Sequence, residues 1–367
     1  ILFTLFTGLL TSFKYLQHWA PCYDFGIFSQ MFNYMKETLQ PLTTCERDGL
    51  LSHFAVHFSP IYYLLLPFFF IFPSPVTLLM GQAAIIASGL IPLYLICKRH
   101  KLSNAAVILF SLCYVLLPSM ANGCFFFLHE NKFLTPLILW LAFALEKNKW
   151  IPSVIFTLLL LAVKEDAPVY AAVLGLYFIV SRRNISKGAL VFVLSIIYFI
   201  TVSYFMSKYG LGTMSYRYDN FIYDGSGSLF TVIKAVILNP IYTVHEAFDE
   251  EKIKFILQML VPLAFMPLMI KKPSRIILLI PFILLNLMSD YTYQHNINFQ
   301  YTYGSAAFLF YLMILNYQDM KPGFRCKVLA VAATSSIFMF MCNTYYRTSG
   351  YESYKLSLIH ISEPTRH

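Results

Sequence analysis

The chain is a succession of long apolar runs separated by short polar segments, and the runs recur along almost its whole length. A helix needs roughly 17–25 predominantly apolar residues to cross the bilayer core. The pattern therefore predicts an all-α fold, a polytopic transmembrane helix bundle of about 11 spans. The expected spans are 1–17, 75–97, 103–120, 131–146, 150–163, 167–181, 187–207, 253–270, 275–289, 303–318 and 326–343.

The segment after the first span predicts a helix of a different kind. From Asp24 to Leu39, apolar side chains recur at alternating intervals of three and four residues, which is the period of one helix face. These side chains are Phe25, Phe28, Phe32, Met35 and Leu39. Such a stripe predicts an amphipathic helix that lies on the membrane surface.

The run His57–Phe72 is apolar enough to span, but two features argue against a span. Pro60 and Pro67 interrupt it, which favours a broken, re-entrant or interfacial hairpin buried against protein. A span here would also place the later basic loops on the side that usually lacks them. We therefore assign all of 18–74 to one large outer loop with interfacial and re-entrant helices.

Basic residues gather in five short loops on one side of the predicted bundle. These loops hold more than half of the 27 lysines and arginines, but only two acids, Glu146 and Asp319. Short cytoplasmic loops are enriched in basic residues, so the opposite side is expected to face outward. A second large outer loop is then expected at 208–252, with a short interfacial helix near Leu229–Leu238. The basic residues of the five loops are Lys98, Arg99, Lys101, Lys147, Lys149, Arg182, Arg183, Lys187, Lys271, Lys272, Arg275, Lys321, Arg325 and Lys327.

Composition agrees with a single transmembrane domain over residues 1–343. Hydrophobic residues make up 58% of the chain and charged residues 12%, whereas a soluble domain has about 25% charged residues. The basic loops account for much of the +9 net charge, so no nucleic-acid partner is expected. Phosphate-binding and dinucleotide-binding glycine motifs are absent from the sequence. Cys22 and Cys45 share the first outer loop, where a disulfide and two free thiols both remain open.

The two ends of the chain are treated separately from the fold. Residues 344–356 are expected to form an outer tail. Residues 357–367 resemble a translated sequencing adapter and are left out of the fold reasoning. The chain begins with Ile1 and not with Met, as expected of a gene fragment.

Five polar clusters lie at the outer ends of the expected spans. Ionisable groups near membrane depth are costly and usually mark function, although each cluster taken alone is equally consistent with a solvated interface. Their position on one side favours a shared pocket. The clusters are Tyr23-Asp24-Phe25-Gly26, His53 with His57–Pro60, His129-Glu130-Asn131, Lys164-Glu165-Asp166, and Gln294-His295-Asn296 with Gln300 and Tyr301.

Three roles are open for Asp24: a general base that deprotonates an acceptor hydroxyl, a metal ligand, or the N-cap of the amphipathic helix. His53 and His57 are four residues apart and would share a helix face. Together with His129 and Glu130 they offer ligands for a divalent cation such as Mg or Mn, although a role outside metal binding is the stronger expectation for His53. The zinc-protease motif HExxH is absent, which argues against a protease.

The remaining clusters suggest contacts with a phosphorylated sugar. Lys164 is expected to meet a phosphate, while Glu165 or Asp166 holds a metal ion or a sugar hydroxyl. The alternative is a solvated turn between two helices. His295, Gln300 and Tyr301 supply imidazole, amide and phenol groups of the kind that bind sugars.

Four of these stretches resemble one known family. YDFGIF from Tyr23, HFSPIYYLLLPFFFIFPSP from His57, LHEN from Leu128 and KEDAP from Lys164 look like the bacterial and archaeal integral membrane family called domain of unknown function 2079. The resemblance covers roughly residues 15–315. That family is similar in layout to the GT-C glycosyltransferases, which have a large first outer loop, an acidic residue after the first span and a polyprenyl-phosphate sugar donor. The resemblance implies that Asp24 is that acid, although many GT-C enzymes carry an acidic pair there and Asp24 stands alone.

The first hypothesis is a GT-C-like glycosyltransferase at the outer face of a bacterial cytoplasmic membrane. It would move a sugar from a polyprenyl-phosphate donor to the hydroxyl of an envelope acceptor. Asp24 would deprotonate that hydroxyl, and Lys164 and His57 would steady the phosphate. His129, Glu130, Glu165, Asp166 and His295 would line the pocket or hold a divalent ion. Two alternatives remain open: a transporter or lipid flippase, and a membrane assembly partner without catalysis.

Overall fold

The computed structural model describes residues 1–18, 22–47, 49–212, 214–222 and 229–348 of the chain. Helices dominate this part, and its only strands form a two-residue antiparallel pair, β1 (Leu42–Thr43) and β2 (Leu51–Ser52). The all-α prediction is confirmed for the described residues. The helices are α1 (Leu2–Leu16), α2 (Cys22–Thr38), α3 (Leu66–Ile71), α4 (Pro75–Ser88), α5 (Leu90–Arg99), α6 (Asn104–Leu116), α7 (Pro118–Phe125), α8 (Leu134–Glu146), α9 (Trp150–Leu161), α10 (Ala167–Val180), α11 (Ile185–Tyr209), α12 (Leu229–Leu238), α13 (Pro240–Ala247), α14 (Glu250–Leu260), α15 (Tyr303–Asp319) and α16 (Pro322–Thr348).

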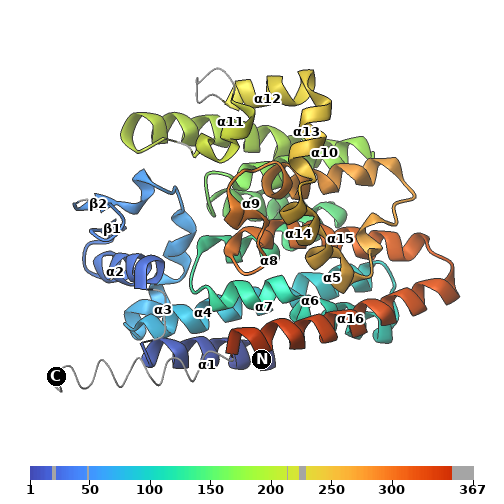
Figure 1. The fold of residues 1–367 in the computed structure, drawn as a ribbon, viewed down its shortest axis with the longest axis horizontal. Coiled ribbons are helices and arrows are strands. Elements are labelled where there is room, and N and C mark those ends of the chain that lie inside the picture. Colours follow the sequence, from blue (N-terminus) through green and yellow to red (C-terminus); the bar gives the residue numbers. More distant parts are fainter. Residues whose placement is uncertain (19–21, 48, 213, 223–228, 349–367) are drawn as a thin grey trace.

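The long helices lie side by side in a stack, with α11 near the top of Figure 1 and α1 and α16 along the bottom. Helix α1 packs on α4, α16 packs on α6, and α8 packs against both α9 and α15. Helices α10 and α11 approach closely because Gly175 and Gly188 face each other: a Cβ on either would lie 2.7 Å from the other's carbonyl oxygen. Small residues at such crossings are typical of helix packing in membranes.

Four helical segments are long and apolar enough to cross a membrane: Pro75–Arg99, Asn104–Phe125, Ile185–Tyr209 and Pro322–Asn343. Shorter apolar helices cover Leu2–Leu16, Trp150–Leu161, Ala167–Val180 and Pro273–Leu287. A membrane-type helical fold is therefore supported, while the predicted number of about 11 spans is not confirmed. One reason is that α15 is buried on all sides from Tyr303 to Tyr317, so its apolar character serves the protein core.

The predicted span 253–270 is wrong as a continuous helix. Helix α14 ends at Leu260, and the chain continues through two short 3-10 turns joined by Ala264 and Phe265, which both have positive φ. Pro262 and Pro267 cause the break, because proline removes a backbone donor and clashes with the preceding turn. The predicted span 275–289 likewise consists of 3-10 and π turns between Pro273 and Leu287.

The amphipathic helix predicted after the first span is α2, but its apolar face meets protein. Phe25, Phe28, Phe32 and Met35 are all buried, and the rings of Phe28 and Phe32 pack on Tyr62. Leu39 does not belong to this face, because it follows the helix with a positive φ and is 60% exposed. The apolar face of α2 therefore packs the first loop against the bundle.

The His57–Phe72 run is broken, as its prolines predicted. A 3-10 turn covers Pro60–Leu64, and the short helix α3 follows it and packs on α2 and α4. The backbone N–H of Ile61 donates to the carbonyl of Ala162, which ties this run to the end of α9. Its backbone is therefore satisfied within the protein, as irregular backbone at membrane depth requires.

Two predictions about the later chain have different outcomes. A helix is present at Leu229–Leu238 as α12, with the expected bounds, and its interfacial position stays a prediction. Helix α16 continues to Thr348, five residues beyond the predicted end of the last span. Most of the predicted outer tail and all of the adapter-like segment lie outside the described residues. The alternative of a Cys22–Cys45 disulfide is not found, because Cys45 is an exposed free cysteine.

The bundle has two chemically different ends. Helices α8, α10 and α15 each begin beside an expected polar cluster and end beside a basic loop: α8 between Glu130 and Glu146, α10 between Asp166 and Arg183, and α15 between Tyr301 and Asp319. We call these the pocket end and the basic end.

At the basic end, two acids join loops that are distant in sequence. Glu146 contacts Arg99 at 3.2 Å, His100 at 2.8 Å and Arg183 at 3.6 Å. Asp319 contacts the buried Arg275 at 2.6 Å. The basic loops that share one side in the sequence prediction therefore also meet in space.

Candidate functional site

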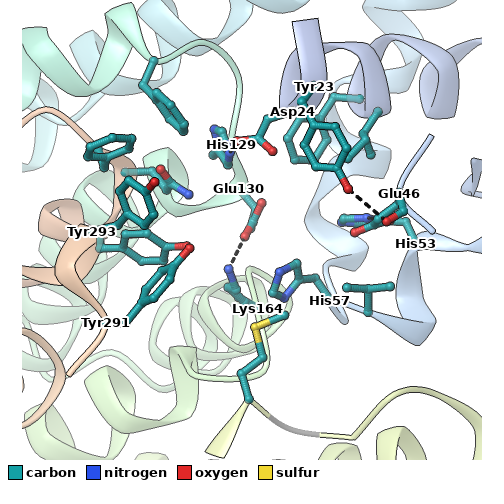
Figure 2. Close-up of a pocket in the computed structure, with 18 of the residues that line it drawn as sticks. Tyr23, Asp24, Glu46, His53, His57, His129, Glu130, Lys164, Tyr291 and Tyr293 are labelled. Carbon is teal, nitrogen blue, oxygen red and sulfur yellow. Dashed lines mark hydrogen bonds and ion pairs between the residues drawn. The ribbon is translucent and has the colours of Figure 1, made fainter. Parts of the chain in front are cut away.

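The pocket end contains a cavity of about 550 Å³ that draws on segments from across the chain. Each of the five predicted polar clusters contributes at least one lining residue. In Figure 2, Tyr23, Asp24 and Glu46 form one side, Tyr291 and Tyr293 the other, and His129, Glu130 and Lys164 lie between them. The predicted site residues that line it are Asp24, His57, His129, Glu130, Lys164, Gln300 and Tyr301, with His53 beside them.

Asp24 is the partly exposed acid of this cavity. Its side chain is 38% exposed, and its Oδ2 lies 3.7 Å from His129 Nε2. The contact with His129 lowers the pKa of Asp24 and outweighs burial, so the carboxyl group is ionised at neutral pH. Burial lowers the pKa of His129, so this imidazole is neutral. Asp24 lies inside α2, two residues after Cys22, so it is not the N-cap. As an acid in the first turn, it still interacts favourably with the helix dipole.

Glu130 and Lys164 form a buried ion pair behind Asp24. Lys164 Nζ lies 2.7 Å from Glu130 Oε1, and both side chains are at most 2% exposed. The Tyr62 hydroxyl donates to the other oxygen of Glu130 at 2.6 Å. Burial would raise the pKa of Glu130, but Lys164 outweighs it and holds that pKa well below its usual range. The charge of Lys164 is therefore already balanced by a protein carboxylate.

His57 and Glu165 form a second pair near Lys164. His57 Nδ1 lies 2.8 Å from Glu165 Oε1, and the backbone N–H of Phe58 donates to Oε2. Burial would raise the pKa of Glu165, but His57 and Lys164 lower it to about 2. Burial and the charge of Lys164 lower the pKa of His57. The neutral ring therefore donates from Nδ1 and keeps Nε2 as an acceptor.

The expected metal site does not fit this geometry. His53 and His57 do not share a helix face, because a 3-10 turn ends at Ala55 between them. Each has its own carboxylate, with His53 Nδ1 lying 2.9 Å from Glu46 Oε2. Within the part of the chain that the structure describes, no three His, Cys, Asp or Glu side chains are grouped as a metal ion requires.

Other predicted residues lie outside the cavity. His295 is 3.6 Å from Glu251 of α14 and does not line it. Glu165 and Asp166 line a second, apolar cavity of about 300 Å³ next to the first. The two cavities share Met214 and Arg217.

The sequence reasoning missed an aromatic wall and one arginine. Tyr216, Tyr291, Tyr293 and Phe299 line the larger cavity together with Arg217. Tyrosine is common at the membrane interface, so tyrosines in outer loops do not by themselves indicate a site. No signal in the sequence distinguished Arg217 from the other basic residues outside the five basic loops.

The pH dependence of stability is expected to report the His57–Glu165 pair. A carboxyl whose folded-state pKa is depressed stabilises the fold above its unfolded pKa, and this contribution disappears as the pH falls through the folded value. For Glu165 this pH range runs from the usual pKa of 4.5 down to the folded-state pKa of about 2. We expect Glu165→Gln to lose roughly 3 kcal/mol of unfolding free energy at pH 7 and the difference to close across this window.

Thermal unfolding in detergent at several pH values checks this prediction. The matched control is Glu250→Gln, because Glu250 is exposed at the start of α14 and should change little. A deficit for Glu165→Gln that stays constant down to pH 2 would mean that His57 and Lys164 do not hold Glu165 in its ionised form.

Comparisons with known proteins agree with the membrane character of the bundle. Searches of curated proteins and of solved structures gave no significant match. The likeness to GT-C enzymes is therefore not confirmed. A family profile described as "Predicted membrane protein (DUF2079)" matches residues 18–360, which is nearly the whole chain. The chain belongs to this family of membrane proteins, the family of domain of unknown function 2079.

Proposed function

We propose that the protein is a membrane glycosyltransferase that moves a sugar from a polyprenyl-phosphate donor to an acceptor hydroxyl at the pocket end. One observation carries this proposal: an ionised, partly exposed carboxylate, Asp24, faces a cavity whose other lining carboxylates, Glu46 and Glu130, are paired with the buried side chains of His53 and Lys164. Asp24 is thus the acid of this cluster that is left accessible to a substrate. We place the pocket end on the outer side of a bacterial cytoplasmic membrane because the basic loops lie at the other end.

The proposed reaction is a direct displacement at the anomeric carbon. Asp24 accepts the proton of the acceptor hydroxyl, and the acceptor oxygen forms a bond to the anomeric carbon. The bond between that carbon and the phosphate oxygen breaks, and the polyprenyl phosphate leaves with the electron pair. The anomeric centre is thereby inverted. Basic groups at the cavity stabilise the charge that develops on the leaving phosphate.

The cavity is suited in size and chemistry to a sugar. Its volume of about 550 Å³ lies within the range of roughly 300–1,000 Å³ that is usual for ligand pockets. Tyr216 and Tyr293 are 50% and 42% exposed, and both line the cavity. A ring face next to carboxylate and imidazole groups matches a pyranose, which has an apolar face and a polar rim.

The experiment is a transfer assay with the purified full chain in proteoliposomes. Tritiated hexosyl and pentosyl polyprenyl phosphates serve as donors, and an extract of envelope lipids serves as the acceptor pool. The proposal expects tritium to move from the donor to a second lipid only when the protein is present. Counterflow of the same donors across the vesicle membrane without any new sugar–acceptor bond would overturn it in favour of transport.

A further inference from the structure

We infer that Arg217 binds the phosphate of an amphiphilic ligand whose hydrocarbon chain lies in the second, apolar cavity and whose polar group lies in the first. The inference deepens the proposed function and rests on it for the identity of the polar group, a sugar. The binding site itself is argued from Arg217 and the two cavities that meet at it.

Arg217 is a buried cation that no carboxylate of the described residues contacts directly. It is 6% exposed, and no carboxylate oxygen of the described residues lies within 4.0 Å of its guanidinium. One nitrogen, Nε, is buried and has no hydrogen-bond partner among the described residues. A buried charge usually requires an ion partner, and an unpaired donor costs free energy. A ligand anion would supply both the missing counter-charge and a hydrogen-bond acceptor for Nε.

The surroundings of Arg217 hold it in place without neutralising it. Its carbonyl oxygen accepts hydrogen bonds from the backbone N–H of Asp290 and from the Ser289 hydroxyl. Its guanidinium carbon lies 5.0 Å from the ring centroid of Tyr291 and 5.1 Å from that of Tyr301. Its Nη2 donates to Met214 Sδ at 3.0 Å and to the Tyr301 hydroxyl at 3.5 Å. These neutral partners and the aromatic rings orient the guanidinium without supplying an anion, and Nε has no partner among the described residues.

The other cations at this end are already occupied. Lys164 is paired with Glu130, and Lys132 donates to the carbonyl of Phe127. Arg47 also lines the larger cavity, but it is exposed and donates to the carbonyl of Glu46. The expectation that Lys164 meets the phosphate is therefore better transferred to Arg217.

The second cavity explains why the anion should carry a hydrocarbon chain. Its apolar lining comes from Val169, Phe199, Val232, Ile233 and Leu284, and it begins at Arg217 and Met214, where the larger polar cavity ends. An anion at Arg217 thus has an apolar space on one side and a polar space on the other. A phosphodiester or phosphomonoester of a lipid alcohol fits both, whereas free phosphate would leave the apolar space unused.

Asp166 and Glu165 are the two acids that line the apolar cavity, which Arg217 also lines. Glu165 is already bound to His57, whereas Asp166 Oδ1 has no hydrogen-bond partner among the described residues. Burial raises the pKa of Asp166 to about 6. A protonated Asp166 can donate a hydrogen bond to a phosphate oxygen and does not repel the anion.

The test is equilibrium binding of tritiated farnesyl phosphate to the full chain in nanodiscs, with tritiated farnesol as the uncharged analogue. The wild type should prefer the phosphate over the alcohol by roughly 10- to 100-fold, the range of a charge-assisted hydrogen bond. Arg217→Met should abolish this preference, and Arg217→Lys should retain part of it. Arg182→Met is the matched control, because it removes an exposed arginine at the basic end that lines neither cavity, and it should bind like the wild type.

Two further measurements test the role of the ligand's hydrocarbon chain and separate this inference from the transfer reaction. Ile233→Trp narrows the apolar cavity away from Arg217 and should weaken farnesyl phosphate binding. Inorganic phosphate at equal concentration should not compete; equal competition would overturn the amphiphile. A folded Arg217→Met or Arg217→Gln protein with an unchanged preference would overturn the role of Arg217. Binding without transfer of any sugar would instead refute the proposed function and leave this site intact.

Discussion

Asp24→Asn is expected to reduce the rate of sugar transfer by about 10²–10⁴-fold, the usual contribution of a positioned general base. The amide is nearly isosteric with the carboxylate but cannot accept the proton of the hydroxyl. Because the Asp24 side chain is 38% exposed and only 3.7 Å from His129, the substitution should leave the fold intact. The rate constant of transfer in proteoliposomes, at saturating donor, is the measurement.

The control for this prediction comes from the same helix. Glu37 lies on the exposed side of α2, away from the cavity, and Glu37→Gln removes the same charge from the same helix. It should transfer sugar at the wild-type rate. If Asp24→Asn transferred sugar as fast as Glu37→Gln, Asp24 would have no catalytic role. His57, oriented by Glu165, would then become the candidate base.

Lys164→Met is expected to destabilise the protein by about 3–5 kcal/mol, because it leaves Glu130 buried without its counter-charge. Few buried groups could replace that charge: the remaining close partner of Glu130 is the neutral hydroxyl of Tyr62. The drop should appear as a lower midpoint in thermal or detergent-induced unfolding. Lys149→Met, at an exposed loop position, is the control and should change stability little.

A double-mutant cycle separates the pair from its two parts. Lys164→Met combined with Glu130→Gln removes both charges and should be more stable than the sum of the single losses implies. Additive losses would show that Glu130 and Lys164 act independently despite their separation of 2.7 Å. The double variant also gives a folded background in which transfer can be assayed without this ion pair.

The sequence predicted which polar clusters converge, because hydrophobic periodicity decides which end of a helix each cluster occupies. Asp24, His129 and Lys164 each stand at one end of an apolar run, and the runs are short enough that those ends meet. The broken His57–Phe72 run was predictable for a similar reason, since Pro60 and Pro67 act locally. Helix α12 likewise has its predicted bounds because its apolar run stands alone between polar loops.

Pairing within the cavity was not predictable from the pattern. Whether Lys164 meets Glu130 or a ligand depends on side-chain geometry across 34 sequence positions. The possible metal cluster is not formed among the described residues for the same reason, because His53 and His57 each have a carboxylate partner of their own. Burial on all sides, as in α15, produces the same apolar run as contact with lipid, so the number of spans could not be read from hydropathy alone.

The position of α15 has a consequence for how the chain is assembled. Chains are synthesised from the N-terminus, and α15 is followed by a single helix, α16, within the described residues. Until it arrives, Thr135 lacks its acceptor at Tyr303, and Glu146 lacks the hydroxyl of Tyr311. The earlier helices must therefore hold open a partly polar slot during insertion. A chain that stops before residue 303 would lack the centre of the bundle. We therefore expect the protein to become compact only after α15 has left the ribosome.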